Sequence, residues 1–231
     1  MTGTVTHPPV LLPIAIPVGE RSLPGVLGLP ATPVGVVVFA HGCGSTHTSP
    51  RNAMVARVLE HRGFATVRFD LLVPDEAADR ENMFDIELLA GRLGAVLDWV
   101  AGRPEIAGLP VGLFGASTGA AAALAAAARW PGKVAAVVSR GGRPDLASPW
   151  LESVRAPTLL LVGGLDEEVL VLNEAAAGEF RCHHQVAVVR GATHLFEEPG
   201  TLAEVARQAA DWFVEFGSNR EAPSMAAPEP S

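Results

Sequence analysis

Short apolar runs rich in β-branched residues alternate along the chain with longer segments of helical periodicity. Residues 34–40 form an unbroken apolar run, as expected of a strand that is buried on both faces. Residues 84–100 instead place Ile, Leu and Val three and four positions apart, which predicts an amphipathic helix. The same criteria predict further strands at 64–69, 110–114, 133–139, 157–162 and 185–189, and further helices at 50–61, 118–130, 167–180 and 201–216.

Strands that alternate with helices in this way indicate an α/β fold, with a mostly parallel sheet and helices on both faces. The leading segment 10–29 is also strand-like, but Pro13, Pro17 and Pro24 interrupt it. Because proline cannot donate a ladder hydrogen bond, we expect this segment to supply edge strands.

The composition agrees with one folded domain. The chain has 231 residues, of which 48% are hydrophobic, and its mean hydropathy is +0.28. This is enough apolar material for a large core, and we expect a single domain over residues 1–216. Residues 217–231 turn to Ser, Asn, Glu and Pro, a composition that predicts a disordered tail.

The net charge and the absence of targeting signals limit the expected binding partners and the expected location of the protein. With 17 basic and 25 acidic residues the net charge is −8, and no basic cluster is present, so neither nucleic acid nor an anionic membrane surface is an expected partner. No secretory signal is visible and no apolar run approaches the ~20 residues of a membrane span. The two cysteines cannot form a disulfide framework. We expect a reduced, cytoplasmic protein, either a monomer or a homodimer.

The most informative residues are 115–119, Gly-Ala-Ser-Thr-Gly, between a predicted strand and an Ala-rich helix. A serine hydroxyl is a poor nucleophile unless it is well presented and a base takes its proton. A sharp strand-to-helix turn presents it, and glycines two residues before and after relieve the backbone crowding of such a turn. Ser117 is therefore the candidate nucleophile.

A serine nucleophile of this architecture needs an acid and then a histidine further along the chain. Asp166 follows the strand 157–162, and His194 follows the strand 185–189. Carboxyl ends of parallel strands meet at one edge of the sheet, where ligands bind. We therefore expect His194 to be the base and Asp166 its orienting acid. Asp145 also follows a strand and is the rival acid.

The oxyanion formed in acyl transfer needs two aligned hydrogen-bond donors. The backbone N–H of Thr118, directly after the candidate nucleophile, is one expected donor. The other is the N–H of Cys43, in a glycine-rich loop after the strand 34–40. In this role Cys43 uses its backbone and not its sulfur, and His41 is expected to brace the loop.

Three further groups have two interpretations each. Arg140 and Arg143 lie at a strand's carboxyl end and either pair with Asp145 or Asp166 or form a clamp for an anionic substrate. Cys182-His183-His184 offers metal-ligand side chains, but consecutive residues rarely converge on one ion, so a surface turn is favoured over a metal site. The acidic loop 74–81 is interpreted as a solvated connection that could border the site.

The chain resembles the α/β-hydrolase superfamily, and within it the small, lidless members that are similar to dienelactone hydrolases. The resemblance covers roughly residues 34–216 and rests on the segments 41–44, 115–119, 163–166 and 191–194. It implies an eight-stranded sheet and hydrolysis of esters or related acyl bonds. Dienelactone hydrolases proper carry a cysteine nucleophile, so Ser117 favours a more general carboxylesterase-type enzyme.

These observations predict a serine hydrolase that cleaves an ester, lactone or thioester of a small molecule through an acyl-enzyme, without a cofactor or metal. Two alternatives share the fold. In one, a hydroxyl replaces water, so that the enzyme transfers the acyl group or forms a lactone. In the other, the protein binds a ligand without turning it over, because fold does not determine function.

Overall fold

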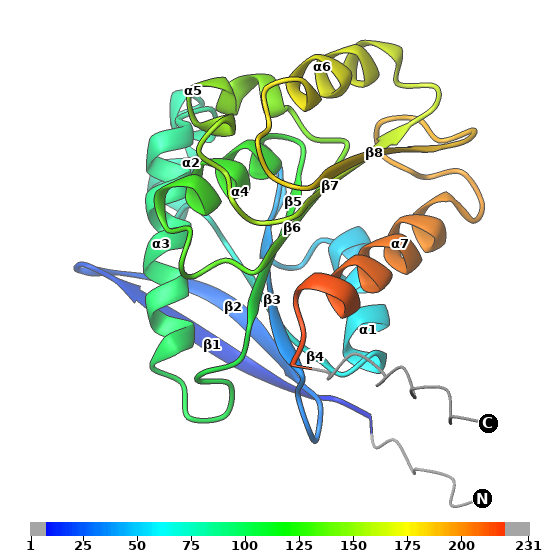
Figure 1. Ribbon diagram of the computed structural model, residues 1–231. Coiled ribbons are helices and arrows are strands. Elements are labelled where there is room, and N and C mark those ends of the chain that lie inside the picture. The colour runs from blue at the N-terminus through cyan, green and yellow to red at the C-terminus, as the bar shows by residue number, and fades with distance from the viewer. Residues whose placement is uncertain (1–7, 220–231) are drawn as a thin grey trace, which may run out of the picture.

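Eight strands form one sheet in the order β1-β2-β4-β3-β5-β6-β7-β8 in the computed structural model, which describes residues 8–219 (Figure 1). Strands β3 to β8 are mutually parallel, whereas β1 and β2 form an antiparallel hairpin that joins the sheet through β4. The fold is therefore the eight-stranded, mostly parallel α/β-hydrolase sheet predicted from sequence. The strands are β1 (Val10–Val18), β2 (Arg21–Leu29), β3 (Gly35–Ala40), β4 (Phe64–Phe69), β5 (Val111–Ala116), β6 (Ala136–Arg140), β7 (Thr158–Gly163) and β8 (His184–Val189).

The prediction of edge strands in the leading segment is correct for β1 and wrong for β2. Strand β2 lies between β1 and β4, but its pairing with β4 covers only residues 25–28. Pro24 precedes this ladder, and its carbonyl accepts a hydrogen bond from the Asp70 N–H at 3.0 Å. Pro24 lies opposite Ala15 of β1 but one residue beyond the β2–β4 ladder, so its missing N–H removes no hydrogen bond from the β2–β4 ladder.

Helices cover both faces of the sheet, as predicted. Helices α1 and α7 pack on one face, and α3 and α4 lie on the other (Figure 1). The helices are α1 (Pro50–His61), α2 (Pro74–Ala77), α3 (Ile86–Ala101), α4 (Thr118–Arg129), α5 (Ser148–Leu151), α6 (Glu167–Ala177) and α7 (Thr201–Phe216), with the short 3-10 turns η1 (Glu81–Met83) and η2 (Pro144–Ala147). The short elements α2, α5, η1 and η2 lie outside the strands and helices predicted from the sequence.

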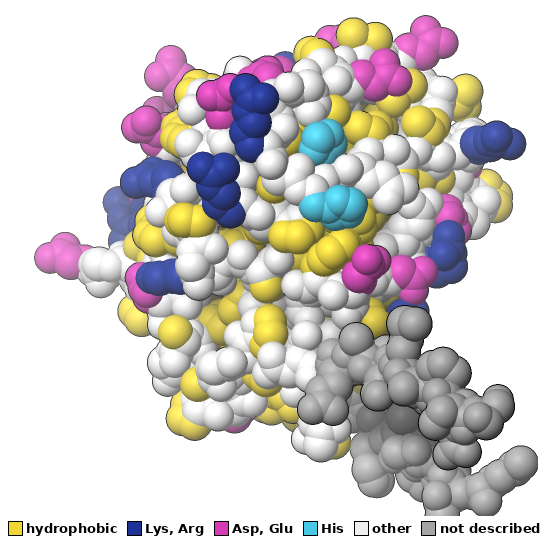
Figure 2. Space-filling view, viewed as in Figure 1, with side chains coloured by type: hydrophobic (Ala, Val, Ile, Leu, Met, Phe, Trp, Pro, Cys, Tyr) yellow, Lys and Arg dark blue, Asp and Glu magenta, His cyan; other side chains and the backbone are white. Residues whose placement is uncertain are grey.

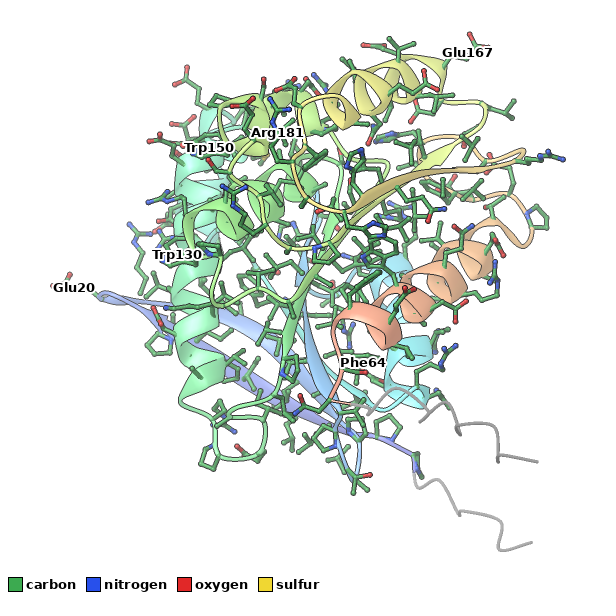
Figure 3. All side chains as sticks on the ribbon, in the orientation of Figure 1. Glu20, Phe64, Trp130, Trp150, Glu167 and Arg181 are labelled. Atoms are coloured by element: carbon green, nitrogen blue, oxygen red, sulfur yellow. The ribbon has the colours of Figure 1, made fainter. Side chains whose placement is uncertain are left out.

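The buried strands account for the stability of this arrangement. Every residue of β3, β4 and β7 is buried, and burial on both faces explains the continuous apolar run of β3, whereas β4 also buries Thr66 and Arg68. Helix α4 packs closely because its alanines are short, and the ring of Trp130, labelled in Figure 3, lies against Gly94 of α3. The core therefore holds the carboxyl ends of the parallel strands at a fixed edge.

Surface features add two observations. On the described part of the face in Figure 2, acidic and basic side chains are interspersed along the margin. Within residues 8–219, no helix has the length and apolar character needed to cross a bilayer. Helix α7 ends at Phe216, but the prediction of a disordered tail from residue 217 is wrong for residues 217–219, because the Asn219 N–H donates to the Val34 carbonyl at 2.9 Å. Residues 1–7 and 220–231 lie outside the described residues.

Candidate active site

Ser117 occupies a strained turn between β5 and α4. Its φ of 51° and ψ of −121° lie in a region that residues with a Cβ rarely adopt. A Cβ on Gly115 would clash with the Cα of Ala120, and one on Gly119 would clash with the carbonyl oxygen of Ala40. The two glycines thus relieve backbone crowding, as their spacing indicated, and the turn has the geometry expected of a nucleophile elbow.

Asp166 and His194 are joined by a hydrogen bond. Asp166 Oδ2 lies 2.7 Å from His194 Nδ1, so Nδ1 carries the proton and Nε2 is left as the acceptor of the ring. Asp166 occupies the position before α6, yet its side chain makes no capping bond there. Figure 3 shows Glu167, the first residue of α6, at the outer end of this helix. The Asp166 side chain is 14% exposed, and its carboxylate accepts a hydrogen bond from His194 instead of capping α6.

His194 lies over the backbone beside the elbow. Gly141 is packed against it, since a Cβ on that glycine would lie 3.6 Å from His194 Cε1. The preceding residue, Arg140, accepts a hydrogen bond on its carbonyl from the Ser117 N–H at 3.2 Å. The structure therefore brings Ser117, His194 and Asp166 to one edge of the sheet.

The rival acid, Asp145, is held elsewhere. Its two carboxylate oxygens accept hydrogen bonds from Arg143 Nε at 2.8 Å and Nη2 at 2.7 Å. This bidentate contact raises the pKa of Arg143. Of the two interpretations of Arg143, the structure thus shows the salt bridge, and the guanidinium is not directed toward an anion clamp.

The loop after β3 approaches the elbow from the other side. Gly42 lies against Ser117, because a Cβ on Gly42 would be 3.1 Å from Ser117 Cβ. The N–H of Cys43 donates to Thr118 Oγ1 at 3.0 Å. The Cys43 N–H therefore points toward Thr118, the residue after the candidate nucleophile, and is already hydrogen-bonded to the hydroxyl of that threonine. The Thr118 N–H, in the first turn of α4, has no partner within the helix.

His41 braces this loop through both ring nitrogens. The N–H of Leu71 donates to His41 Nε2 at 3.0 Å, so the ring proton is on Nδ1, which donates to the carbonyl of Gly42 at 2.9 Å. Burial lowers the pKa of His41 below its ordinary value of 6.5. His41 is thus a neutral structural histidine that links the loop to the end of β4, and neither nitrogen is left to bind substrate.

The pH dependence of stability is expected to report on His41. Because its folded-state pKa lies below the unfolded value, the unfolded chain binds more protons as pH falls below about 6.5, and stability falls with it, by at most about 1.4 kcal/mol per pH unit. Urea unfolding at pH 7.5 and at acidic pH should therefore show a smaller loss for His41→Gln than for the native chain. Equal losses would contradict the assignment.

Arg140 differs from Arg143 in its surroundings. It is 9% exposed, and burial lowers its pKa to about 10, with the charge of Arg51 as a second cause. Its Nε and Nη1 are enclosed and have no hydrogen-bond partner. Among residues 8–219, no carboxylate forms an ion pair with it. The predicted salt bridge to Asp145 or Asp166 is therefore wrong for Arg140.

A cavity of about 320 Å³ adjoins the elbow. One wall is formed by the glycine-rich loop 41–46 and Thr118. The opposite wall is apolar and consists of Leu71, Leu72, Pro74, Ala77, Met83 and Leu89. Pro74 and Ala77 belong to the acidic loop 74–81, so of its two interpretations the structure supports the one in which this loop borders the site.

A second histidine–aspartate pair was also missed. The carboxylate of Asp70 accepts from the backbone N–H and from Nδ1 of His47, the latter at 2.9 Å. Asp70 follows β4 directly and lines the cavity. Its place after a strand, at the edge where Asp166 and His194 lie, is a signal that would have found it.

The segment 182–184 leads into β8, which begins at His184, and is not the predicted surface turn, since the His183 carbonyl accepts from the Thr158 N–H of β7 at 2.9 Å. His184 Nδ1 donates to the Cys182 carbonyl at 3.0 Å, while the His183 ring stacks on Trp212 with 5.5 Å between ring centres. In the part of the chain that the structure describes, no three His, Cys, Asp or Glu side chains are grouped so that they could hold a metal ion.

The fold and the elbow define the class of protein. The family model for the alpha/beta hydrolase fold matches residues 35–220, and the chain belongs to this family. A dienelactone hydrolase from Anabaena variabilis ATCC 29413 is 48% identical in sequence, with a TM-score of 0.88 over 91% of this chain and 99% of that one. Within the family the chain is thus similar to dienelactone hydrolases.

Other relatives agree on the fold but carry different names. Est1E from Butyrivibrio proteoclasticus is 16% identical, with a TM-score of 0.76 over 88% of this chain and 98% of that one. Two curated proteins of Mycobacterium tuberculosis, provisionally named phosphoribosyl transferases, are 57% identical over 202 residues. This match covers 87% of the chain but only 46% of those proteins, so the chain spans about half of their length.

Proposed function

We propose that the protein is a serine hydrolase that cleaves esters, or the related lactones and thioesters, of small molecules. The observation that carries this proposal is the strained Ser117 at the sheet edge where His194 is hydrogen-bonded to Asp166. Strain of this kind persists where the surroundings enforce it, and it recurs at catalytic residues. The hydrolase family and the similarity to a dienelactone hydrolase support the reaction class.

Each group has one role in the proposed mechanism. His194 Nε2 takes the proton of Ser117, whose Oγ attacks the ester carbonyl, and Asp166 keeps the imidazole in the required tautomer. The Thr118 and Cys43 N–H groups stabilise the oxyanion, the latter after the Thr118 hydroxyl gives up its bond. His194 then protonates the leaving group, and water releases the acyl group with His194 again as the base.

The cavity fits the acyl part of the substrate. Its lining includes Cys43 and Thr118, the proposed oxyanion donors, but neither His194 nor Asp166. The leaving group has to lie beside His194, since this residue protonates it, so the cavity is on the acyl side. About 320 Å³ is at the small end of the ~300–1,000 Å³ typical of ligand pockets. We therefore propose a short to medium apolar acyl group as the substrate class.

Ala77 offers a test of this acyl assignment. Ala77→Phe places a ring in the cavity, whereas Ala78→Phe adds the same ring at an exposed neighbour that does not line it. In the native enzyme, kcat/KM should rise from p-nitrophenyl acetate to the hexanoate, by up to about fourfold per buried methylene. We expect Ala77→Phe to abolish this rise and Ala78→Phe to retain it. An unchanged chain-length profile in Ala77→Phe would place the acyl group elsewhere.

The alternatives have weaker support. Acyl transfer to a hydroxyl would use the same residues, but the His194 side chain is 40% exposed, which favours access of water. Phosphoribosyl transfer, suggested by the provisional name of the longer relatives, involves a phosphorylated sugar that the apolar cavity wall does not suit. That activity can reside in the part of those proteins that the chain does not match. A protein that releases no nitrophenol from any p-nitrophenyl ester would instead be a binding protein with this fold.

We also propose a cytoplasmic location. The two cysteines, Cys43 and Cys182, are both free thiols in the structure. Free thiols persist most readily in a reducing compartment.

A further inference from the structure

Residues 72–83 form a wall segment that supplies most of the apolar side chains lining the cavity beside the elbow. The regular structure of this segment is brief, since α2 has four residues and η1 has three. Helices of this length are not stable on their own. The shape of the wall therefore depends on the contacts that the segment makes with the rest of the domain.

The two ends of the wall segment are fixed by neighbouring residues. Just before it, the N–H of Leu71 donates to His41 Nε2 at 3.0 Å. Just after it, Asp85 caps α3, and its Oδ1 accepts from the Leu88 N–H at 2.9 Å. These contacts leave the middle of the segment, which contains α2, to be positioned separately.

Glu76 makes the contacts that position the middle of the wall segment. Its Oε1 accepts from Arg92 Nη2 of α3, beside which α2 lies in Figure 1, and is 3.7 Å from Arg21 Nε of β2. Its Oε2 accepts from the Val73 N–H at 3.2 Å, and its carbonyl oxygen accepts from Asn82 Nδ2 at 2.9 Å. Through Glu76, both short helices of the segment are joined to α3.

The pair of Glu76 and Arg92 is largely withdrawn from water. Their side chains are 15% and 13% exposed, whereas Arg21 is 48% exposed and contributes less. Removal of one partner from a pair at this depth leaves the other charge unpaired, so the segment has to rearrange. Neither residue of the pair lines the cavity. Any effect of the pair on a substrate must therefore pass through the wall segment.

We propose that Glu76 and Arg92 are positioning residues, which hold the wall segment against α3 and thereby determine the length of acyl group that the cavity accepts. Pro74 and Ala77, on either side of Glu76, line the cavity and move with it. When the pair is broken, the wall loses contact with the outer methylenes of the acyl chain. The assignment of the cavity to the acyl group rests on the proposed hydrolase function, whereas the attachment of the wall to α3 does not.

The kinetic test uses Arg92→Met, with Arg80→Met as the matched control. Arg80 is an exposed residue of the same segment, so the chemical change is the same without loss of the pair. The quantity measured is the ratio of kcat/KM for p-nitrophenyl hexanoate to that for the acetate, which lacks the outer methylenes. Arg92→Met should lower this ratio by about tenfold or more, the contribution of about two buried methylenes, with kcat/KM for the acetate within about twofold of native. Arg80→Met should keep the native ratio, and an unchanged ratio in Arg92→Met would overturn the proposal.

A double-mutant cycle tests whether the two residues act as a pair. Glu76→Gln should also lower the hexanoate-to-acetate ratio, and the double variant should lower it no further than the more affected single variant. Effects of the two changes that multiply would contradict a shared role. If Arg92→Met does not fold, Glu76→Gln tests the same pair, and a native ratio in that variant would overturn the proposal.

Amide hydrogen exchange tests the attachment of the wall without turnover. Peptides from residues 72–83 should exchange faster in Arg92→Met than in the native protein or in Arg80→Met, while peptides from β3 and β5 should exchange at the native rate. Native exchange of the wall segment in Arg92→Met would contradict the proposal. Faster exchange in a protein that hydrolyses neither ester would instead refute the hydrolase function alone.

Discussion

Replacement of Ser117 by alanine is expected to lower kcat by about 10⁴–10⁶, because the hydroxyl is the reactant in the proposed mechanism. Folding should be retained. Alanine keeps the Cβ that the native elbow already accommodates at a φ of 51°, and it removes only an oxygen. The variant should thus have nearly the native Tm, with ester turnover close to the uncatalysed rate.

A fluorophosphonate probe makes the same test without a known substrate. The native enzyme should be labelled on Ser117, and Ser117→Ala should not be labelled. Cys43→Ser is the control, because the exposed Cys43 thiol, 3.2 Å from Met83 Sδ, is the rival nucleophile beside the oxyanion loop. This change keeps the backbone donor, so activity should stay within about tenfold of native, against a loss of ~10²–10³ when an oxyanion donor is removed. Labelling that persists in Ser117→Ala would refute the assignment.

Features encoded by neighbouring residues were predictable from the sequence. The elbow is such a feature, because the crowding that Gly115 and Gly119 relieve arises within a few residues and at the adjoining strand. Helix α1 begins and ends as predicted, since Ser49 caps its N-terminus and Pro50 occupies its first position. The parallel sheet followed from the alternation of buried strands and helices.

Features that depend on distant contacts were not predictable. Asp145 and Asp166 both follow a strand, and what distinguishes them is the hydrogen bond of Asp166 to His194, 28 residues further along the chain. The apolar wall of the cavity comes from short turns whose acidic residues face solvent, so its periodicity is too brief to detect. The bond from the Cys43 N–H to the Thr118 hydroxyl joins residues 75 positions apart. Sequence therefore predicted the groups that react more readily than those that shape the substrate pocket.

The acid of the site supplies the second large effect. Asp166→Asn is expected to lower kcat by about 10⁴, since an amide can donate a hydrogen bond to His194 Nδ1 and so favour the tautomer with its proton on Nε2. That tautomer cannot accept the proton of Ser117. The fold should tolerate the change, because the native carboxylate makes no capping bond to α6 and asparagine has nearly the same size. Circular dichroism and Tm should thus remain close to native.

Asp145→Asn is the matched control, with the same chemical change at the rival acid. Its carboxylate contacts Arg143, and the side chains of this pair are 26% and 37% exposed, so loss of the ion pair should cost at most about 1 kcal/mol of stability. Activity should fall less than about tenfold. The comparison is made as kcat on one activated ester at a pH where the native enzyme is fully active. A larger loss in Asp145→Asn than in Asp166→Asn would mean that the hydrogen bond between Asp166 and His194 is structural and that the acid lies after β6.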